Sequence, residues 1–172
     1  MNYADIKYCD VANGEGVRVS LFVSGCTHHC KECFNKEAWD FHYGNPFTQK
    51  EIDRILEYLK PNYIAGLSLL GGEPMEPVNQ EGILPLLRVV KQTYPEKNIW
   101  CYTGYLFDKD VLDKMCKESE VTKEIVSYLD IVVDGEFMID RKNLKINFRG
   151  SDNQRIIDVK KTLDAGEIVH WE

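Results

Sequence analysis

Apolar and polar residues alternate along this chain in short segments that predict several strands. The run at 19–23 is rich in valine, leucine and phenylalanine, and Gly25 ends it. Such a run is typical of a buried strand. Apolar runs of the same kind predict four more strands, at 63–70, 98–102, 130–133 and 156–159.

Between these strands the apolar positions recur at helical spacing. Residues 48–51 form a capping-box pattern, which opens a helix. A second helix is expected at 83–94, with Pro85 in its first turn because proline is poorly tolerated further in. Two shorter helices follow, one capped by Asp108 and one near 121–128.

Strands that alternate with helices predict the α/β class, with right-handed crossovers and a mostly parallel sheet. Four or so βα units are too few for a complete eight-stranded barrel. We therefore expect an open, curved partial (βα) barrel whose sheet is flanked by helices. The length of 172 residues fits a single domain over residues 1–172.

Composition narrows the class of protein. A net charge of −7 provides no basic stripe to neutralise phosphates, which argues against a nucleic-acid binder. The apolar runs are far shorter than the roughly 20 residues that a membrane span needs. The first residues carry neither the basic nor the apolar region of a secretion signal. We expect a soluble, cytoplasmic protein with reduced cysteines.

Cys26, Cys30 and Cys33 follow the first strand directly, at the spacing C-x-x-x-C-x-x-C. Thiolates this close in sequence, on one loop, can converge on a soft metal centre. A 4Fe-4S cluster has four irons, and the usual set of four cysteines would occupy all of them. Three cysteines leave one iron open to a small molecule, so the pattern predicts a cluster that performs chemistry.

The cysteines have two alternative uses. Structural zinc could be held by the three cysteines with His28 or His29, but such sites usually draw their ligands from two separated segments. Disulfide pairing would involve the scattered cysteines, Cys9, Cys101 and Cys116, in a chain with no sign of secretion. The spacing favours the cluster over both.

Four segments whose residues could form a ligand-binding site each follow a predicted strand directly. Besides the cysteine loop, these segments are 71–74, 102–104 and 134–135. In parallel α/β proteins, ligands bind at the carboxyl ends of the strands. This topology would gather four dispersed segments at one place, which favours a functional site over four independent turns.

Several residues of these segments have side chains or backbone that could bind a ligand. Gly71 and Gly72 let the backbone approach a ligand closely, and the Glu73 carboxylate could accept bonds from a ligand ammonium. Thr103 and Asp134 offer oxygens to a ligand hydroxyl, a ligand ammonium or a hard cation. Each of these residues also has an ordinary structural explanation, as part of a turn or a helix cap.

Beyond the fourth strand, residues 147–155 are rich in polar side chains. The guanidinium of Arg149 in this segment could pair with a ligand carboxylate, with an acidic partner or in a surface salt bridge. The sequence leaves open whether the segment serves a cofactor or a partner.

The cysteine spacing, the aromatic Phe34 after the last cysteine and the run Gly71-Gly72-Glu73-Pro74 resemble the radical S-adenosylmethionine superfamily. Members often have Gly-Gly-Asp-Pro, and Glu73 keeps the charge of that aspartate. A narrower resemblance is to the activating proteins of anaerobic (class III) ribonucleoside-triphosphate reductases. It rests on five further segments: Asn13-Gly14-Glu15-Gly16, Phe22-Val23-Ser24-Gly25-Cys26, Trp100-x-Tyr102-Thr103-Gly104-Tyr105, Val133-Asp134-Gly135-x-Phe137 and Arg149-Gly150-Ser151-x-Asn153-Gln154.

The resemblance implies a fold and a set of site residues. The fold would be the open partial barrel of the radical S-adenosylmethionine type. Cys26, Cys30 and Cys33 would be the catalytic and metal-binding residues, holding a 4Fe-4S cluster whose open iron binds S-adenosylmethionine. The implied cofactor contacts are Gly71, Gly72 and Glu73 for the methionine part, Glu32, Cys33 and Phe34 for the adenine, and Thr103 and Asp134 for the ribose or carboxylate side, with Arg149 as a further candidate.

The resemblance also implies a reaction and its partners. One electron from an external reductant, such as reduced flavodoxin, would cleave S-adenosylmethionine to methionine and a 5′-deoxyadenosyl radical. That radical would take a hydrogen atom from one glycine near the C-terminus of the reductase and leave a glycyl radical there. The chain would thus be an oxidoreductase whose substrate is another protein.

Two rival functions are open at this point. One is an activase for another glycyl radical enzyme, such as pyruvate formate-lyase, although such proteins are usually longer. The other is a non-enzymatic module that binds zinc or an iron–sulfur cluster. A reconstituted anaerobic sample that is brown and cleaves S-adenosylmethionine on reduction would exclude the second.

Overall fold

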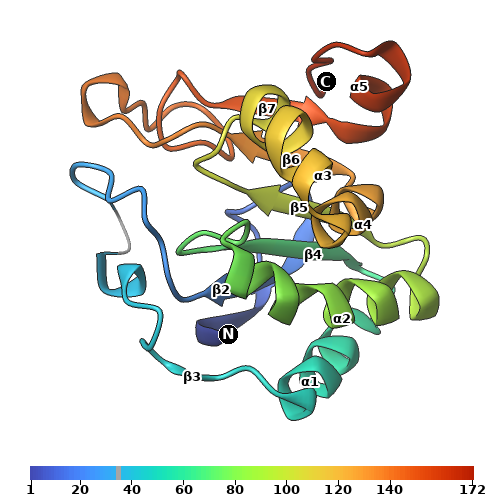
Figure 1. Ribbon diagram of the computed structural model, residues 1–172. Helices are drawn as coiled ribbons and strands as arrows, with labels where there is room; N and C mark the ends of the chain where they lie inside the picture. Colours follow the sequence, from blue (N-terminus) through green and yellow to red (C-terminus); the bar gives the residue numbers. More distant parts are fainter. Residues whose placement is uncertain (34–35) are drawn as a thin grey trace.

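The computed structural model describes residues 1–33 and 36–172, and within them one mixed sheet organises the molecule (Figure 1). Its strands lie in the order β3-β1-β2-β4-β5-β6-β7. Their bounds are β1 Asn2–Asp10, β2 Val17–Val23, β3 Asn45–Pro46, β4 Ile64–Gly71, β5 Asn98–Tyr102, β6 Ile131–Asp134 and β7 Arg155–Asp158.

The helices connect these strands. The α-helices are α1 Gln49–Leu59, α2 Pro77–Thr93, α3 Cys116–Glu118, α4 Glu120–Tyr128 and α5 Val159–Ala165. The remaining helical segments are the 3₁₀ turns η1 Lys36–Trp39 and η3 Ile139–Arg141 and the π-helix η2 Phe107–Met115. No helix among the described residues is both long enough and apolar enough to cross a membrane.

The expected open partial barrel with a mostly parallel sheet is wrong. Strands β2, β4, β5 and β6 pair in parallel, but β1 pairs antiparallel with β2 and β3, and β7 pairs antiparallel with β6. The pattern missed β1 because Tyr3 is the only buried residue of that strand. Strand β7 returns antiparallel because the connection over 135–154 contains only the short η3 and no crossover helix.

Alternate residues of the parallel strands face opposite sides of the sheet. One set packs with α1, α2 and α4 in the main core: Val19, Leu21, Leu67, Leu69, Ile99, Cys101 and Val132. The other set faces a cavity at the carboxyl ends of the strands, which is lined by Phe22, Leu70, Tyr102 and Val133. The sheet therefore separates a helix-covered core from a face that holds a cavity.

Helix α1 confirms the capping box, with Thr48 as N-cap and reciprocal bonds to Glu51. The start predicted for the helix at 83–94 is wrong, because α2 begins at Pro77 and holds Pro85 in its interior. Proline is favoured at the first helical position, and buried neighbours such as Ile83 anchor the turn that contains Pro85.

One prediction about a charged residue is wrong, and one buried charged residue was not anticipated. Asp108 does not cap a helix, since Leu106 precedes η2 and Asp108 accepts a bond from Arg155 Nη2 at 3.0 Å. Arg18, assigned no role from the sequence, is fully buried on the same side of the sheet as the cavity. Its guanidinium donates to Ser68 Oγ at 2.8 Å and to Leu67 O at 3.0 Å, and burial lowers its pKa to about 10.

Candidate cofactor site at the carboxyl ends of the parallel strands

A cavity of about 500 Å³ lies where the parallel strands end. Figure 1 shows the cysteine loop and the 135–154 connection at this same end of the sheet. Most of the residues predicted for a site line the cavity: Cys26, Cys30, Cys33, Gly71, Gly72, Glu73, Thr103 and Arg149. Glu32 and Asp134 are not among the lining residues, and Phe34 lies outside the described residues.

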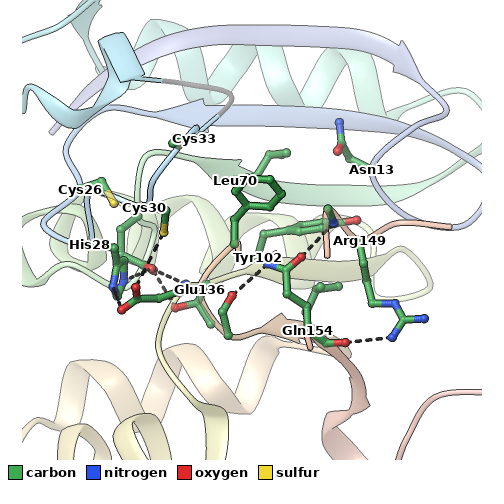
Figure 2. A pocket seen from close by; sticks show the side chains of 18 of the residues that line it. Asn13, Cys26, His28, Cys30, Cys33, Leu70, Tyr102, Glu136, Arg149 and Gln154 are labelled. Atoms are coloured by element: carbon green, nitrogen blue, oxygen red, sulfur yellow. Dashed lines mark hydrogen bonds and ion pairs between the residues drawn. The ribbon is translucent and has the colours of Figure 1, made fainter. Parts of the chain in front are cut away.

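The backbone of the cysteine loop is held by the segment that follows it. Gly25 N donates to Ala38 O at 2.7 Å, and Cys26 N donates to Trp39 O at 3.2 Å. Residues His29 and Glu32 have left-handed φ values of 50° and 57°. These conformations are unusual for residues other than glycine, and they turn the chain just before Cys30 and Cys33. Figure 2 shows the three cysteines gathered on one side of the cavity.

The chemistry of the cysteines suits a soft metal centre. Burial raises the pKa of Cys26 to about 11 and also raises that of Cys30, so a metal bound at these sulfurs displaces a proton from each. Within residues 1–33 and 36–172, no three cysteine, histidine or acidic side chains are placed to hold one metal ion. A cluster takes each thiolate on a different iron, so the three sulfurs need not converge on one atom.

Gly71 and Gly72 allow β4 to end in close contact with the cysteine loop. Gly71 has φ +112°, and a Cβ at Gly72 would lie 2.6 Å from Gly25 O and 2.8 Å from Ala38 O. Gly72 N donates to Val23 O at 2.8 Å. A side chain at either position would therefore force the two strand ends apart.

Glu73 joins the ends of three segments through its carboxylate, of which 1% is exposed. Oε1 lies 2.8 Å from His28 Nε2 and accepts from Gly104 N at 2.7 Å. Oε2 accepts from Thr103 Oγ1 and from Met75 N, both at 2.8 Å. Protein donors thus occupy both oxygens that the sequence suggested for a ligand ammonium, and the Thr103 hydroxyl is used in the same network.

A second buried carboxylate, Glu76, holds the cysteine loop from the same turn. Its Oε1 accepts from Thr27 Oγ1 at 2.6 Å and from Tyr105 OH at 3.2 Å. Glu76 was not among the predicted site residues, although its place directly before Pro77 is that of a helix N-cap. The two carboxylates fix Thr27 and His28, the residues that follow Cys26.

His28 lies between two acidic side chains. Its Nδ1 is 3.3 Å from Glu136 Oε1, while Glu136 Oε2 accepts from Cys30 Sγ at 3.9 Å. Burial disfavours the charged ring, but bonds and charges from Glu73 and Glu136 outweigh it and raise the pKa of His28. His28 therefore links the segment after β4, the cysteine loop and the segment after β6, and carboxylates engage both ring nitrogens, one of which a zinc ligand would need for the metal.

Asp134 has a structural role in this arrangement. It is fully buried, and its carboxylate accepts from Arg155 Nε at 3.0 Å, from Arg155 Nη2 at 2.5 Å and from Phe107 N at 2.7 Å. Arg155 also binds Asp108, so this group joins β6, β7 and η2. The Asp134 side chain is therefore fully occupied away from the cavity lining.

The segment at 149–154 is organised by Gln154. Its Oε1 accepts from Gly150 N at 2.9 Å and from Ser151 N at 3.2 Å, and its Nε2 donates to Gly135 O at 2.9 Å. Arg149 Nη1 donates to the Gln154 carbonyl at 2.9 Å. Figure 2 shows Arg149 and Gln154 across the cavity from the cysteines.

Three residues that line the cavity each carry a buried donor without a hydrogen-bond partner among the described residues: Trp39 Nε1, Tyr102 OH and Arg149 Nε. Buried polar groups are nearly always paired, so three unpaired donors around one cavity are unusual, and acceptor oxygens of a ligand would suit them. The cavity volume is within the range of small-molecule sites. Three thiols on one side and unpaired donors elsewhere in the lining fit a thiolate-bound cluster together with a carboxylate- and hydroxyl-bearing cofactor.

Comparison with known proteins gives consistent matches. The family model described as a 4Fe-4S single cluster domain matches residues 12–157. The chain is 43% identical over 158 residues to the anaerobic ribonucleoside-triphosphate reductase-activating protein of Enterobacteria phage T4, covering 91% of this chain and 93% of that protein. The proteins of the same name from Pasteurella multocida (strain Pm70) and Escherichia coli (strain K12) are 40% and 38% identical, over 91% and 90% of this chain and 96% of each relative.

Proposed function

Because this chain belongs to the family of anaerobic ribonucleoside-triphosphate reductase-activating proteins and carries a 4Fe-4S single cluster domain, we propose that Cys26, Cys30 and Cys33 hold the cluster in the cavity described above. The protein is a glycyl-radical-enzyme activating enzyme, and its target is the anaerobic reductase. The observation that carries the assignment of the site is that three cysteines line the same cavity as three residues with unpaired buried donors.

The cofactor proposed to bind beside the cluster is S-adenosylmethionine. When bound, cluster and cofactor supply a one-electron reductive cleavage of the sulfonium and removal of a hydrogen atom from a glycine of the reductase. A reduced flavodoxin or a similar protein is the proposed electron donor.

The residues of this chain bind and orient these groups. Glu73 and Glu76 fix the loop that presents the cysteines, and Gly71 and Gly72 bring β4 close enough to border the methionine part. The four protein donors on Glu73 favour a positioning role over direct contact with the ligand ammonium.

The opposite wall of the cavity supplies hydrogen-bond donors. Arg149 and Tyr102 carry two of the three unpaired donors, which suit the cofactor carboxylate and hydroxyls. Contacts of Glu32 and Phe34 with the adenine remain a prediction from the sequence.

The assay for this function mixes the reconstituted protein anaerobically with the reductase, S-adenosylmethionine and a reductant. A glycyl doublet in the electron paramagnetic resonance spectrum is the expected result. Pyruvate formate-lyase in place of the reductase should give no doublet. A doublet on pyruvate formate-lyase alone would assign the protein to the rival class of activases.

Arg149→Ala is expected to weaken S-adenosylmethionine binding by about ten- to hundredfold, the range for loss of a hydrogen bond to a charged group. Anaerobic equilibrium binding to the reconstituted protein measures this. Arg141→Ala is the matched control, because Arg141 pairs with Asp152 at 2.6 Å and does not line the cavity. Unchanged cofactor affinity with weaker binding of the reductase would instead assign Arg149 to the partner.

A further inference from the structure

The last residues of the chain fold back along β7. Asp158 N donates to Val169 O and Trp171 N donates to Ile156 O, both at 2.9 Å. Val169 N also donates to Thr162 Oγ1 at 2.9 Å. This tail lies beyond residue 157, where the family match ends, so the shared domain assigns it no role.

Trp171 carries the tail onto the cavity side of the sheet. Its ring centroid lies 5.3 Å from that of Trp100 and 6.3 Å from that of Phe148, and the Trp100 and Phe148 centroids are 5.4 Å apart. All three pairs are close to edge-to-face, the preferred geometry for aromatic rings. Trp100 is 1% exposed and belongs to a strand, so it provides a fixed surface for the other two rings.

Phe148 connects this aromatic group to the cofactor site. It lines the cavity and has a left-handed φ of 63°. For a bulky residue this conformation is strained and persists only where its surroundings hold it. The next residue is Arg149, whose direction depends on the backbone at Phe148.

We propose that Trp171 is a positioning residue for the cofactor site. Its ring holds Phe148 against Trp100, which keeps the backbone at Phe148 left-handed and directs Arg149 into the cavity. The tail thereby acts on the donors of the cavity wall without touching the ligand. This inference rests on the proposed function only for the claim that Arg149 serves the cofactor.

Hydrogen exchange tests the positioning step without any cofactor. In Trp171→Ala, the amides of Gly150 and Ser151, which donate to Gln154, should exchange roughly two- to tenfold faster, as loss of an aromatic pair predicts. Amides of α2 should be unchanged, and Trp171→Phe should restore the native rates. Leu163→Ala is the control, because Leu163 is 46% exposed on α5.

Two results of the exchange experiment would overturn the proposal. One is faster exchange confined to the tail, with Gly150 and Ser151 unaffected. The other is uniformly faster exchange throughout the protein, which would make Trp171 a general stability residue.

Cofactor binding tests the second step. Trp171→Ala should weaken S-adenosylmethionine binding by roughly two- to tenfold, while Trp171→Phe binds as the native protein does. In the Arg149→Ala background, Trp171→Ala should have no further effect, because both act through one guanidinium. Additive losses would refute the route through Arg149. Altered exchange with unaltered binding would uphold the positioning of the segment and refute the cofactor role proposed for Arg149, so the two failures are distinguishable.

Discussion

Replacement of Cys26, Cys30 or Cys33 by alanine is expected to abolish the glycyl radical on the reductase. Each thiol would hold one iron, and among the described residues no other cysteine lines the cavity to replace it. The measurements are iron content after anaerobic reconstitution and the electron paramagnetic resonance doublet. We expect both to fall to background in every single variant.

Cys9→Ser is the matched control for these three variants. Cys9 is an exposed free thiol in β1, outside the cavity lining. It should leave the iron content and the doublet unchanged. A single alanine variant of the cysteine loop that retained a full cluster and a full doublet would show that this loop does not hold the cluster.

The second large effect is expected for Glu73→Ala. The substitution leaves the amides of Met75 and Gly104, the Thr103 hydroxyl and the His28 ring buried without their acceptor. Loss of one partner of a buried charged group typically costs about 3–5 kcal/mol of unfolding free energy. Denaturant unfolding of the protein without its cluster measures this loss, and the iron content after reconstitution should fall with it.

Two further substitutions separate the possible roles of Glu73. Glu73→Gln keeps the shape but places an amide NH₂ against donor groups, so we expect an intermediate loss of stability. Glu81→Ala, at an exposed position of α2, should have little effect. Native stability in Glu73→Ala combined with weaker S-adenosylmethionine binding would contradict the positioning role and restore the direct contact with the ligand ammonium.

The predictable part of the fold is the part with a regular apolar pattern. Strands β2 and β4 were indicated by continuous apolar runs because both of their faces are covered. Strand β1 has one buried residue, and β3 consists of Asn45–Pro46, so neither produces such a pattern. The antiparallel edges, and with them the true architecture, were therefore not predictable from periodicity.

In the site, too, features with a local sequence pattern were predictable and contacts between distant residues were not. The cysteine spacing and the two glycines pointed to residues that line one cavity, although their roles there remain a prediction. Networks between distant residues were not visible in the sequence, because a buried acid such as Asp134 gives no local signal of its partner. Asp134 ends a strand as a ligand contact would, but Arg155 occupies its carboxylate.

Side chains of β4 face alternate sides of the sheet, which determines the effect of substitutions in this strand. Leu67 and Leu69 contact the helices, whereas Ser68 binds Arg18 and Leu70 borders the cavity. Neighbouring positions in the strand thus affect two different properties, the thermodynamic stability of the fold and the shape of the cavity. Evolution or engineering can tune either one by substitution at every second residue, whereas inserting a single residue in β4 would exchange the two sets and ruin both.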